Sequence, residues 1–170
     1  MKNKELLYYT FTELLNIPVI IAASEKGICW IDFTKDISSF KNDNQFEFKS
    51  VPPSSHKVFG LPKQLKEYAK GNRKKFQVPV DVFGTEFQIS VWKALLTIPY
   101  GELAAYKDIA VAVKHPSSSR AVGNAVGANP LPVIIPCHRV IASDGSLGGY
   151  SGGIQIKIKL LDLEEKFKDK

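Results

Sequence analysis

The sequence contains the stretch Leu131-Pro132-Val133-Ile134-Ile135-Pro136-Cys137-His138-Arg139-Val140. In it, a short apolar run is followed by a thiol, an imidazole and a guanidinium. The run from 131 to 135 predicts a buried strand or extended segment that Pro136 closes. Cys137 is therefore held at the end of a rigid element, beside an imidazole and a guanidinium. Two neighbouring cations favour the thiolate, which is the nucleophilic form of cysteine. The alternative is a buried structural cysteine, because free cysteine packs mostly as a small hydrophobe.

The composition is that of a soluble globular protein. Of 170 residues, 44% are hydrophobic and 24% are charged, which fits one ordinary domain or two small ones. No apolar run approaches the length of a membrane span, and the N-terminus lacks the apolar core of a signal peptide. Cys29 and Cys137 are far apart, so a disulfide scaffold is not expected. We therefore expect a cytoplasmic protein (nuclear in a eukaryote) without a membrane partner.

The net charge of +6 permits a polyanionic partner but says little by itself. Basic side chains outnumber acidic ones by 13 to 9 in residues 1–82 and by 10 to 8 in residues 83–170, so the excess is spread over both halves. Only three basic residues are arginines. Two of these, Arg120 and Arg139, lie in the part of the chain that carries the candidate chemistry.

Residues 1–82 are predicted to form a small α/β domain with a structural role. Two β-rich runs flank the turn sequence Ser24-Glu25-Lys26-Gly27, which predicts a β-hairpin over residues 17–33. Cys29 falls inside the second strand of this hairpin, where core packing is its expected role. The remaining predictions for this half are an irregular loop, a helix and a candidate returning strand, at residues 34–57, 61–69 and 76–80.

Residues 83–170 are predicted to form a mostly helical domain, so that the whole chain is of the α/β (α+β) class. Thr85 and Gln88 fit a capping box that begins the first helix. Two short helices joined by a tight turn indicate a winged helix-turn-helix-like arrangement. Ser117 is the expected cap of the second of these. The helices after the first are expected at about residues 105–113, 120–128 and from 154 onward.

The second helix of this pair is rich in small residues, which allow close approach to a nucleic-acid groove or to another helix. On this helix only Asn124 has a side chain that can hydrogen-bond a base edge. If the helix enters DNA, it does so with little sequence preference. The alternative is plain helix–helix packing, which the pattern alone favours. The small residues are Ala121, Gly123, Ala125, Gly127 and Ala128.

Other kinds of site are less well supported. Gly149-Tyr150-Ser151-Gly152-Gly153 fits the Gly-x-Ser-x-Gly pattern of serine hydrolases, but all three histidines precede Ser151 and the flanks predict a turn and a loop. The cysteines and histidines have no recognised zinc spacing, and no phosphate-binding loop is present. A thiol hydrolase orients its cysteine with a histidine distant in sequence, whereas here His138 adjoins Cys137. We therefore expect no metal and no cofactor.

The motif Ile135-Pro136-Cys137-His138-Arg139-Val140 resembles the signature of the O6-alkylguanine-DNA alkyltransferases, the methylated-DNA–protein-cysteine S-methyltransferases. The resemblance covers residues 83–170, whereas residues 1–82 resemble the family's variable domain only in outline. Further segments match the family in the same order along the chain: Pro99-Tyr100-Gly101-Glu102, Tyr106, Ser119-Arg120-Ala121-Val122-Gly123, Gly127-Ala128-Asn129-Pro130 and Tyr150-Ser151-Gly152-Gly153.

The resemblance implies a DNA repair enzyme that acts once. It would flip O6-alkylguanine, and O4-alkylthymine, out of duplex DNA and transfer the alkyl group irreversibly to Cys137. His138 would act through water as the general base, and Glu164 would orient it. The implied partner is double-stranded DNA containing O6-alkylguanine, bound by a monomer without a cofactor. The alternative is a non-catalytic lesion sensor, against which the presence of Cys137 argues.

The resemblance also implies roles for the residues around the nucleophile. Arg120 would enter the base stack in place of the flipped guanine. Tyr106 would crowd the adjacent phosphate and hydrogen-bond the guanine ring, while Asn129 would brace the turn before the active-site segment. The small-residue helix would lie in the minor groove. The implied DNA contacts are completed by Ala121, Gly123, Asn124, Ala125, Gly127 and Arg139, and the implied pocket walls are Val140, Tyr150, Ser151 and Gly152.

Overall fold

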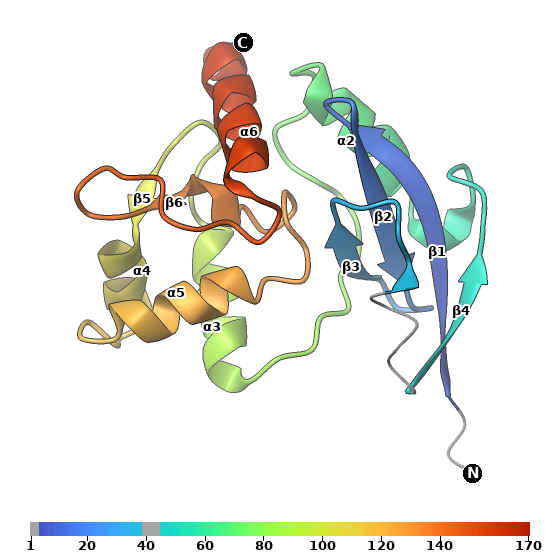
Figure 1. Ribbon diagram of the computed structural model, residues 1–170, viewed down its shortest axis with the longest axis horizontal. Helices are drawn as coiled ribbons and strands as arrows, with labels where there is room; N and C mark the ends of the chain where they lie inside the picture. Colours follow the sequence, from blue (N-terminus) through green and yellow to red (C-terminus); the bar gives the residue numbers. More distant parts are fainter. Residues whose placement is uncertain (1–3, 39–44) are drawn as a thin grey trace. The chain divides into compact units, whose positions relative to one another are not determined.

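The structure, a computed structural model, describes residues 4–38 and 45–170. The chain divides into two compact units, residues 1–82 and 83–170 (Figure 1). The first unit is built on a sheet and the second mostly on helices, so the predicted mixture of α and β structure is confirmed. None of the helices in the described ranges is both long enough and apolar enough to span a bilayer.

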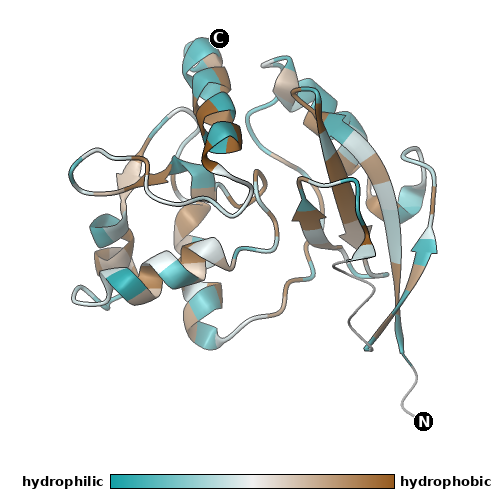
Figure 2. Cartoon of the chain, in the orientation of Figure 1, coloured by the Kyte–Doolittle hydropathy of each residue, from teal (hydrophilic) through white to brown (hydrophobic). Residues whose placement is uncertain are grey.

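A four-stranded sheet with the order β3-β2-β1-β4 forms the centre of the first unit. Strands β1 (Glu5–Leu14) and β2 (Ile17–Ala23) are antiparallel, and Leu15 and Asn16 between them both have positive φ, as a tight two-residue hairpin turn requires. Strand β3 (Ile28–Asp32) pairs antiparallel with β2, which confirms the predicted hairpin. Strand β2 is almost uniformly hydrophobic (Figure 2) because both of its faces are covered.

The prediction of an irregular loop at residues 34–57 is wrong where β4 (Phe46–Ser50) pairs parallel with β1. The strand alternates aromatic and charged side chains, with Phe46 and Phe48 on one face, which is a period-two pattern in a polar context. Residues 39–44 of that predicted loop lie outside the described residues. The candidate strand at 76–80 amounts to a single bridge between Val80 and Ile28.

Helix α2 (Leu61–Ala69) follows the short 3-10 turn η1 (His56–Val58) and packs on β1. Leu61, Leu65 and Tyr68 are fully buried on one side of it, as their helical spacing predicts. The helix ends before Gly71, which has a φ of 69° that favours glycine.

Helices α3 (Glu86–Leu95), α4 (Tyr106–Ala112) and α5 (Ser119–Gly127) pack against one another in the second unit. The predicted capping box begins α3, because Thr85 Oγ1 accepts from Gln88 N at 3.2 Å and Gln88 Oε1 accepts from Thr85 N at 2.9 Å. The prediction that Ser117 caps α5 is wrong, since the residue before that helix is Ser118, whose side chain makes no capping hydrogen bond. The two-stranded parallel pair β5 (Ala104–Ala105) and β6 (Val140–Ile141), with helix α6 (Ile154–Phe167), completes the unit.

The segment before the cysteine is a turn, so the predicted strand is wrong although the predicted burial is right. Ile135 N donates to Leu131 O at 2.9 Å, and Val133 in between has a φ of 77°. Asn129 holds both sides of the turn: its Oδ1 accepts from Leu131 N at 2.9 Å and its Nδ2 donates to Ile135 O at 2.8 Å. The asparagine thus satisfies backbone groups that a neighbouring strand would otherwise pair.

Candidate active site

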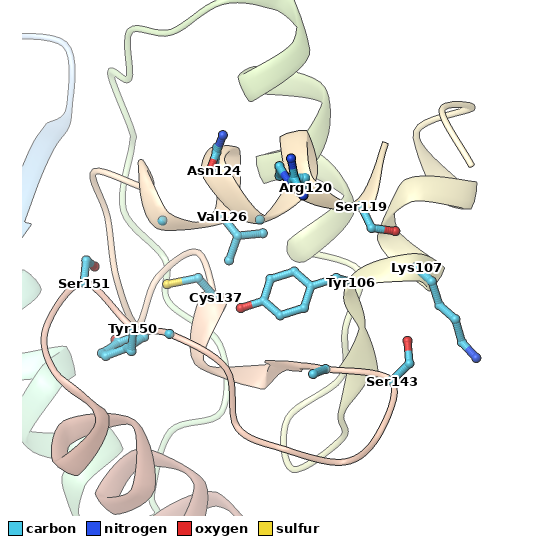
Figure 3. A pocket seen from close by; sticks show the side chains of 14 residues that line it. Tyr106, Lys107, Ser119, Arg120, Asn124, Val126, Cys137, Ser143, Tyr150 and Ser151 are labelled. Carbon is cyan, nitrogen blue, oxygen red and sulfur yellow. The ribbon is translucent and has the colours of Figure 1, made fainter. Parts of the chain in front are cut away.

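Cys137 opens the short 3-10 turn η2 (Cys137–Arg139) and lies at the wall of a pocket of about 630 Å³ (Figure 3). The side chain is 2% exposed. Helices α4 and α5 and the loop after β6 supply the other walls. Residues on these walls include Tyr106, Arg120, Gly123, Asn124, Tyr150 and Ser151.

The thiol is held in its neutral form by its surroundings. Burial raises the pKa of Cys137 to about 11, although a hydrogen bond from Asn129 Nδ2 at 3.0 Å and the charge of Lys157 act in the opposite direction. The expectation that His138 and Arg139 favour the thiolate is wrong. Adjacent side chains leave a 3-10 turn in different directions, and the imidazole of His138 and the guanidinium of Arg139 both reach Glu164 instead of the thiol.

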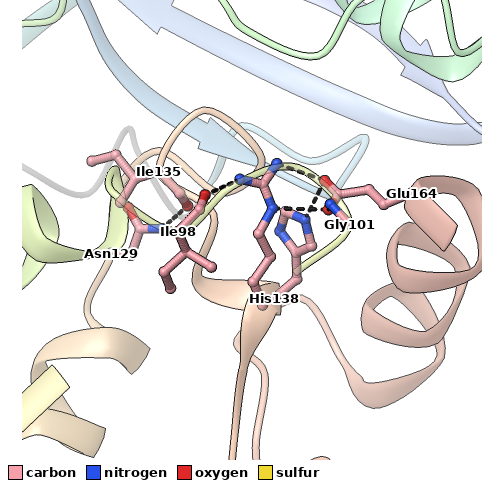
Figure 4. Close-up of polar contacts among 7 residues, drawn as sticks. Ile98, Gly101, Asn129, Ile135, His138 and Glu164 are labelled. Atoms are coloured by element: carbon pink, nitrogen blue, oxygen red, sulfur yellow. Dashed lines mark hydrogen bonds and ion pairs between the residues drawn. The ribbon is translucent and has the colours of Figure 1, made fainter. Parts of the chain in front are cut away.

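His138, Arg139 and Glu164 are buried and form a network of hydrogen bonds (Figure 4). His138 Nε2 lies 2.9 Å from Glu164 Oε1, and Arg139 donates to the same carboxylate through Nε and Nη2, both at 2.8 Å. The network is tied to the chain after α3, since Arg139 Nη1 donates to Ile98 O at 2.7 Å and Gly101 N donates to Glu164 Oε2 at 3.0 Å. It fixes the imidazole ring firmly.

Burial keeps His138 neutral, so that it can act as a base. Burial alone would raise the pKa of Glu164, but hydrogen bonds from His138 and Arg139 outweigh it and hold that pKa far below its ordinary value. Burial lowers the pKa of His138, with Glu164 opposing this in part. An ionised carboxylate only accepts, so Nε2 carries the ring proton. Nδ1 has no hydrogen-bond partner in the described part of the chain, which leaves its lone pair to accept a proton.

Lys157 is a part of the site that the sequence analysis missed. It lies in the first turn of α6, is fully buried, and donates through Nζ to Val140 O at 2.6 Å and to Leu147 O. Burial lowers the pKa of Lys157, and the neighbouring Cys137 raises it in part. A signal was present, because Lys157 and Glu164 are seven residues apart and therefore share one face of α6.

Two tyrosines line the pocket near the thiol, and they come from different elements of the second unit. Tyr106 comes from α4 and Tyr150 from the loop before α6, and burial followed by the nearby Cys137 raises the pKa of both phenols. The loop passes close to Tyr106 at Gly148, where a Cβ would lie 3.1 Å from the hydroxyl oxygen. The φ of 65° at Gly148 also favours glycine.

Helix α5 presents a polar and small-residue face to solvent. Arg120, Ala121, Asn124 and Gly127 are exposed on it, and Gly123 is partly exposed. They lie on the side expected to contact DNA.

Four predicted contacts need correction. Ala125 is 3% exposed and its carbonyl accepts from Trp92 Nε1 at 2.8 Å, so it belongs to the core of the unit rather than to a DNA surface. Arg139 is 6% exposed and its donors are taken by Glu164 and a backbone carbonyl, so it cannot reach a phosphate. Val140 is fully buried beneath the pocket, and neither it nor Gly152 belongs to the lining.

The described residues contain no group of three or more His, Cys, Asp or Glu side chains placed to hold a metal ion. A recessed thiol faces a pocket, with a neutral imidazole and a buried ammonium near it and a small-residue helix at the rim. This combination defines a class, the helix-turn-helix proteins that carry a cysteine nucleophile beneath the second helix.

Comparison with known families identifies the chain. Residues 86–166 match the model of the 6-O-methylguanine DNA methyltransferase, DNA binding domain, and residues 7–82 match that of the 6-O-methylguanine DNA methyltransferase, ribonuclease-like domain. The chain belongs to the 6-O-methylguanine DNA methyltransferase family, which confirms the resemblance found in the sequence.

Individual relatives cover nearly the whole chain. The inducible methylated-DNA–protein-cysteine methyltransferase of Bacillus subtilis is 39% identical over 96% of this chain and 93% of its own length. The methylated-DNA–protein-cysteine methyltransferase of Methanosarcina barkeri is 43% identical over 94% of this chain and 98% of its own.

Solved structures show the same fold. The crystal structure of Mycobacterium tuberculosis O6-methylguanine methyltransferase matches with a TM-score of 0.82 and 37% identity, covering 94% of this chain and 93% of that one. The Mycobacterium tuberculosis protein in complex with DNA matches with the same TM-score and identity, covering 94% of each chain.

Proposed function

We propose that this protein repairs DNA by transferring the alkyl group of O6-alkylguanine, irreversibly, to its own Cys137. The observation that carries the proposal is the position of the thiol at the wall of a pocket, with His138 and Glu164 hydrogen-bonded to each other. The proposal is supported by relatives named methylated-DNA–protein-cysteine methyltransferase and by a similar structure in complex with DNA.

The reaction is a single displacement at the alkyl carbon. Cys137 Sγ forms a bond to that carbon while the bond from carbon to guanine O6 breaks, and the electron pair of the broken bond stays on the guanine. The thiol proton passes through water to His138 Nδ1, and the hydroxyl of Tyr106 donates one proton to the guanine. Solvent then returns a proton to Tyr106 and takes the proton from His138, so that overall one proton passes from the thiol to the guanine. The product is a thioether, which has no hydrolysable bond, so each molecule acts once.

Removal of the thiol proton has to accompany the attack. With a pKa of about 11, only about one Cys137 in ten thousand is a thiolate at pH 7. A neutral imidazole at His138 can accept the proton as the bond to carbon forms. The ammonium of Lys157 stabilises the negative charge that develops on sulfur, because attraction between charges is strong where water is excluded.

The DNA partner is held by the exposed side of α5. A flipped base is the only form in which the O6 atom can reach a recessed thiol. Arg120, exposed on α5 at the pocket, fills the space that the base leaves. Small residues on this helix allow close contact with the groove without sequence readout, which suits lesions that occur anywhere. O4-alkylthymine carries the same oxygen–alkyl bond and is a second substrate; the protein acts as a monomer in the cytoplasm.

The Arg120→Ala variant tests the flipping step. It should react more slowly with O6-methylguanine in duplex DNA than the wild type, while its rate with free O6-benzylguanine stays unchanged, because the free base needs no flipping. Lys93→Ala, which removes one exposed charge from α3 outside the pocket, is the matched control and should change neither rate. Equal losses of both rates in Arg120→Ala would contradict the role.

A lesion sensor is the other function that this fold supports. It would bind the lesion tightly and leave the DNA unchanged. The site favours alkyl transfer instead, because Asn129 is hydrogen-bonded to the thiol and the charge of Lys157 is close to it.

A further inference from the structure

Most of the excess positive charge of the chain lies in one segment of the first unit. Residues 63–75 contain six basic side chains and one acidic one, out of 23 and 17 in the whole chain. The other residues therefore hold 17 basic and 16 acidic side chains and are close to neutral. The segment consists of most of α2 and the loop that follows it.

Three of these lysines, two in α2 and one at the residue that ends it, share one exposed face. Lys63, Lys66 and Lys70 are spaced by three and four residues, which places them within an arc of about 60° on a helix of 3.6 residues per turn. Their face is opposite the buried Leu61 and Tyr68, and all three are exposed. We refer to Lys63, Lys66 and Lys70 as the lysine stripe.

The lysine stripe is not neutralised by its surroundings. Glu67, the one carboxylate of the segment, is bound by Arg73 Nε at 2.7 Å. Arg73 itself is not part of the stripe. Its guanidinium is held near its own loop, because Nη1 donates to Lys75 O at 2.9 Å. Within residues 4–38 and 45–170, no ion pair involves a lysine of the stripe.

The positions of the stripe lysines are unfavourable for the stability of α2. Lys63 lies in the first turn, where the positive end of the helix dipole favours acidic side chains, and that turn contains none. Lys66 is three residues from Lys63 and four from Lys70, so like charges face each other along the stripe. The C-terminal position of Lys66 and Lys70 suits the dipole, but Lys63 has no such structural explanation.

We propose that the lysine stripe binds the phosphate backbone of DNA, as a contact in addition to helix α5. The inference rests on the proposed function, in which DNA is the partner. The stripe extends over about 10 Å of helix, the axial length of about three phosphates on one strand. Lysines act on phosphates as point charges without base readout. Such a contact raises the affinity for any sequence, which suits a protein that must search for rare lesions.

The salt dependence of binding tests the stripe directly. In the triple variant Lys63→Gln/Lys66→Gln/Lys70→Gln, the slope of log affinity against log salt should become shallower by about 2.7, since each phosphate contact contributes about 0.9. Affinity for an undamaged 30-base-pair duplex in about 0.1 M salt should fall at least tenfold. The matched control is Lys26→Gln/Lys35→Gln/Lys49→Gln, which removes three exposed charges from elsewhere in the same unit. Equal slopes in the two variants would overturn the proposal.

A charge reversal separates binding from stability. Lys63→Glu should weaken DNA binding and raise the temperature of unfolding, because an acidic side chain suits the first turn of the helix. A lysine kept for structural reasons would give the opposite change in stability and leave binding unaltered. If the triple variant lost binding to vesicles of anionic lipid while its salt slope on DNA stayed equal to that of the wild type, the assignment of the lysine stripe to DNA would also be overturned.

Reaction with free O6-benzylguanine keeps the two proposals apart. All stripe variants should transfer its benzyl group to Cys137 at the rate of the wild type. If the wild type itself fails to react, the proposed function is at fault. If every variant reacts normally and the stripe variant binds DNA as the control variant does, the stripe alone is at fault.

Discussion

The two cysteines of this chain are both buried, but the charges near them have opposite signs. Cys29 in β3 is 8% exposed and Cys137 is 2% exposed, and burial raises the pKa of each. Cys29 Sγ accepts a hydrogen bond from Ser24 N at 3.1 Å and donates to Gly27 O at 3.5 Å. Hydrogen bonding to Ser24 lowers the pKa of Cys29 in part, whereas the charges near it, the carboxylates of Asp81 and Glu5, raise it. The charge near Cys137 is the ammonium of Lys157, which lowers the pKa of that thiol.

The comparison shows that burial does not distinguish a structural thiol from a nucleophile. Cys137 has an amide donor from Asn129, an ammonium from Lys157 and a pocket from which an alkyl group can reach it. Cys29 has a carboxylate nearby and does not line that pocket. What a thiolate needs is stabilisation of its charge and access, and only one of the two sites supplies both.

Removing each thiol in turn is the strongest way to break this comparison. Cys137→Ala should lose methyl transfer completely and keep its affinity for duplex DNA, since the variant lacks only the nucleophile. Cys29→Ala should transfer one methyl group per molecule, as the wild type does. Loss of a radioactive methyl group from O6-methylguanine DNA measures both. Residual transfer by Cys137→Ala would mean that another side chain is the acceptor.

Replacing the base should produce the next largest effect. His138→Gln keeps a donor toward Glu164 but removes the lone pair of Nδ1, so the rate of transfer should fall by about 10²- to 10⁴-fold. Single-turnover kinetics on duplex DNA at pH 7.5 measure the rate. Reaction of Cys29 with iodoacetamide should be unaffected, because the hydrogen bonds of Cys29 Sγ go to Ser24 N and Gly27 O in the other unit of the chain. A rate within threefold of the wild type would exclude His138 as the base.

Removing the ammonium of Lys157 should change how the reaction rate of Cys137 depends on pH. Neutral His138 supplies a path whose rate does not vary between pH 7 and 9, whereas the thiolate fraction of Cys137 rises with pH up to its pKa of about 11. Direct attack by the thiolate should therefore add to the rate with free O6-benzylguanine and raise it between pH 7 and 9. Lys157→Met removes a charge that lowers this pKa, so the profile should move to higher pH and the rate at pH 8 should fall about tenfold. Lys159→Met, exposed on the same helix, should leave the profile unchanged. A shift toward lower pH would contradict the account.

Truncating the structural thiol should have the smallest effect. Cys29→Ala removes a buried sulfur from β3 and should lower the free energy of unfolding by about 1 kcal/mol. Urea denaturation of the variant and the wild type measures this difference. The rate of methyl transfer should stay within twofold of the wild-type rate, and a larger loss would assign Cys29 a part in the chemistry.

The fold could be predicted where a periodic pattern is local. The hairpin around Ser24–Gly27, helix α2 and the capping box of α3 all follow from residues close together in sequence. Strand β4 was missed because its pairing with β1 is non-local and its flanks are polar. The predicted strand before Cys137 was wrong because side-chain hydrogen bonds from Asn129 replace those of a sheet.

The site could be predicted where the family resemblance specified a residue. The structure brings Asn129 to the thiol and Glu164 to His138, although their catalytic roles stay predictions. The prediction that Arg139 acts on the thiol because the two residues are close in sequence was wrong. Its side chain points into the core, where it binds Glu164. Lys157 was missed because a lysine in an amphipathic helix is ordinarily solvated, and its burial depends on a carbonyl group of β6 and another of the loop that follows β6.

Mass measurement after a single encounter with the lesion tests the central claim most directly. The protein is incubated with an equimolar duplex that contains one O6-methylguanine, and its intact mass and its peptides are then analysed. The account predicts one added methyl group per protein, located on the peptide that contains Cys137, with one lesion lost per molecule. Tight binding without a change in mass, or a methyl group on Cys29, would contradict it.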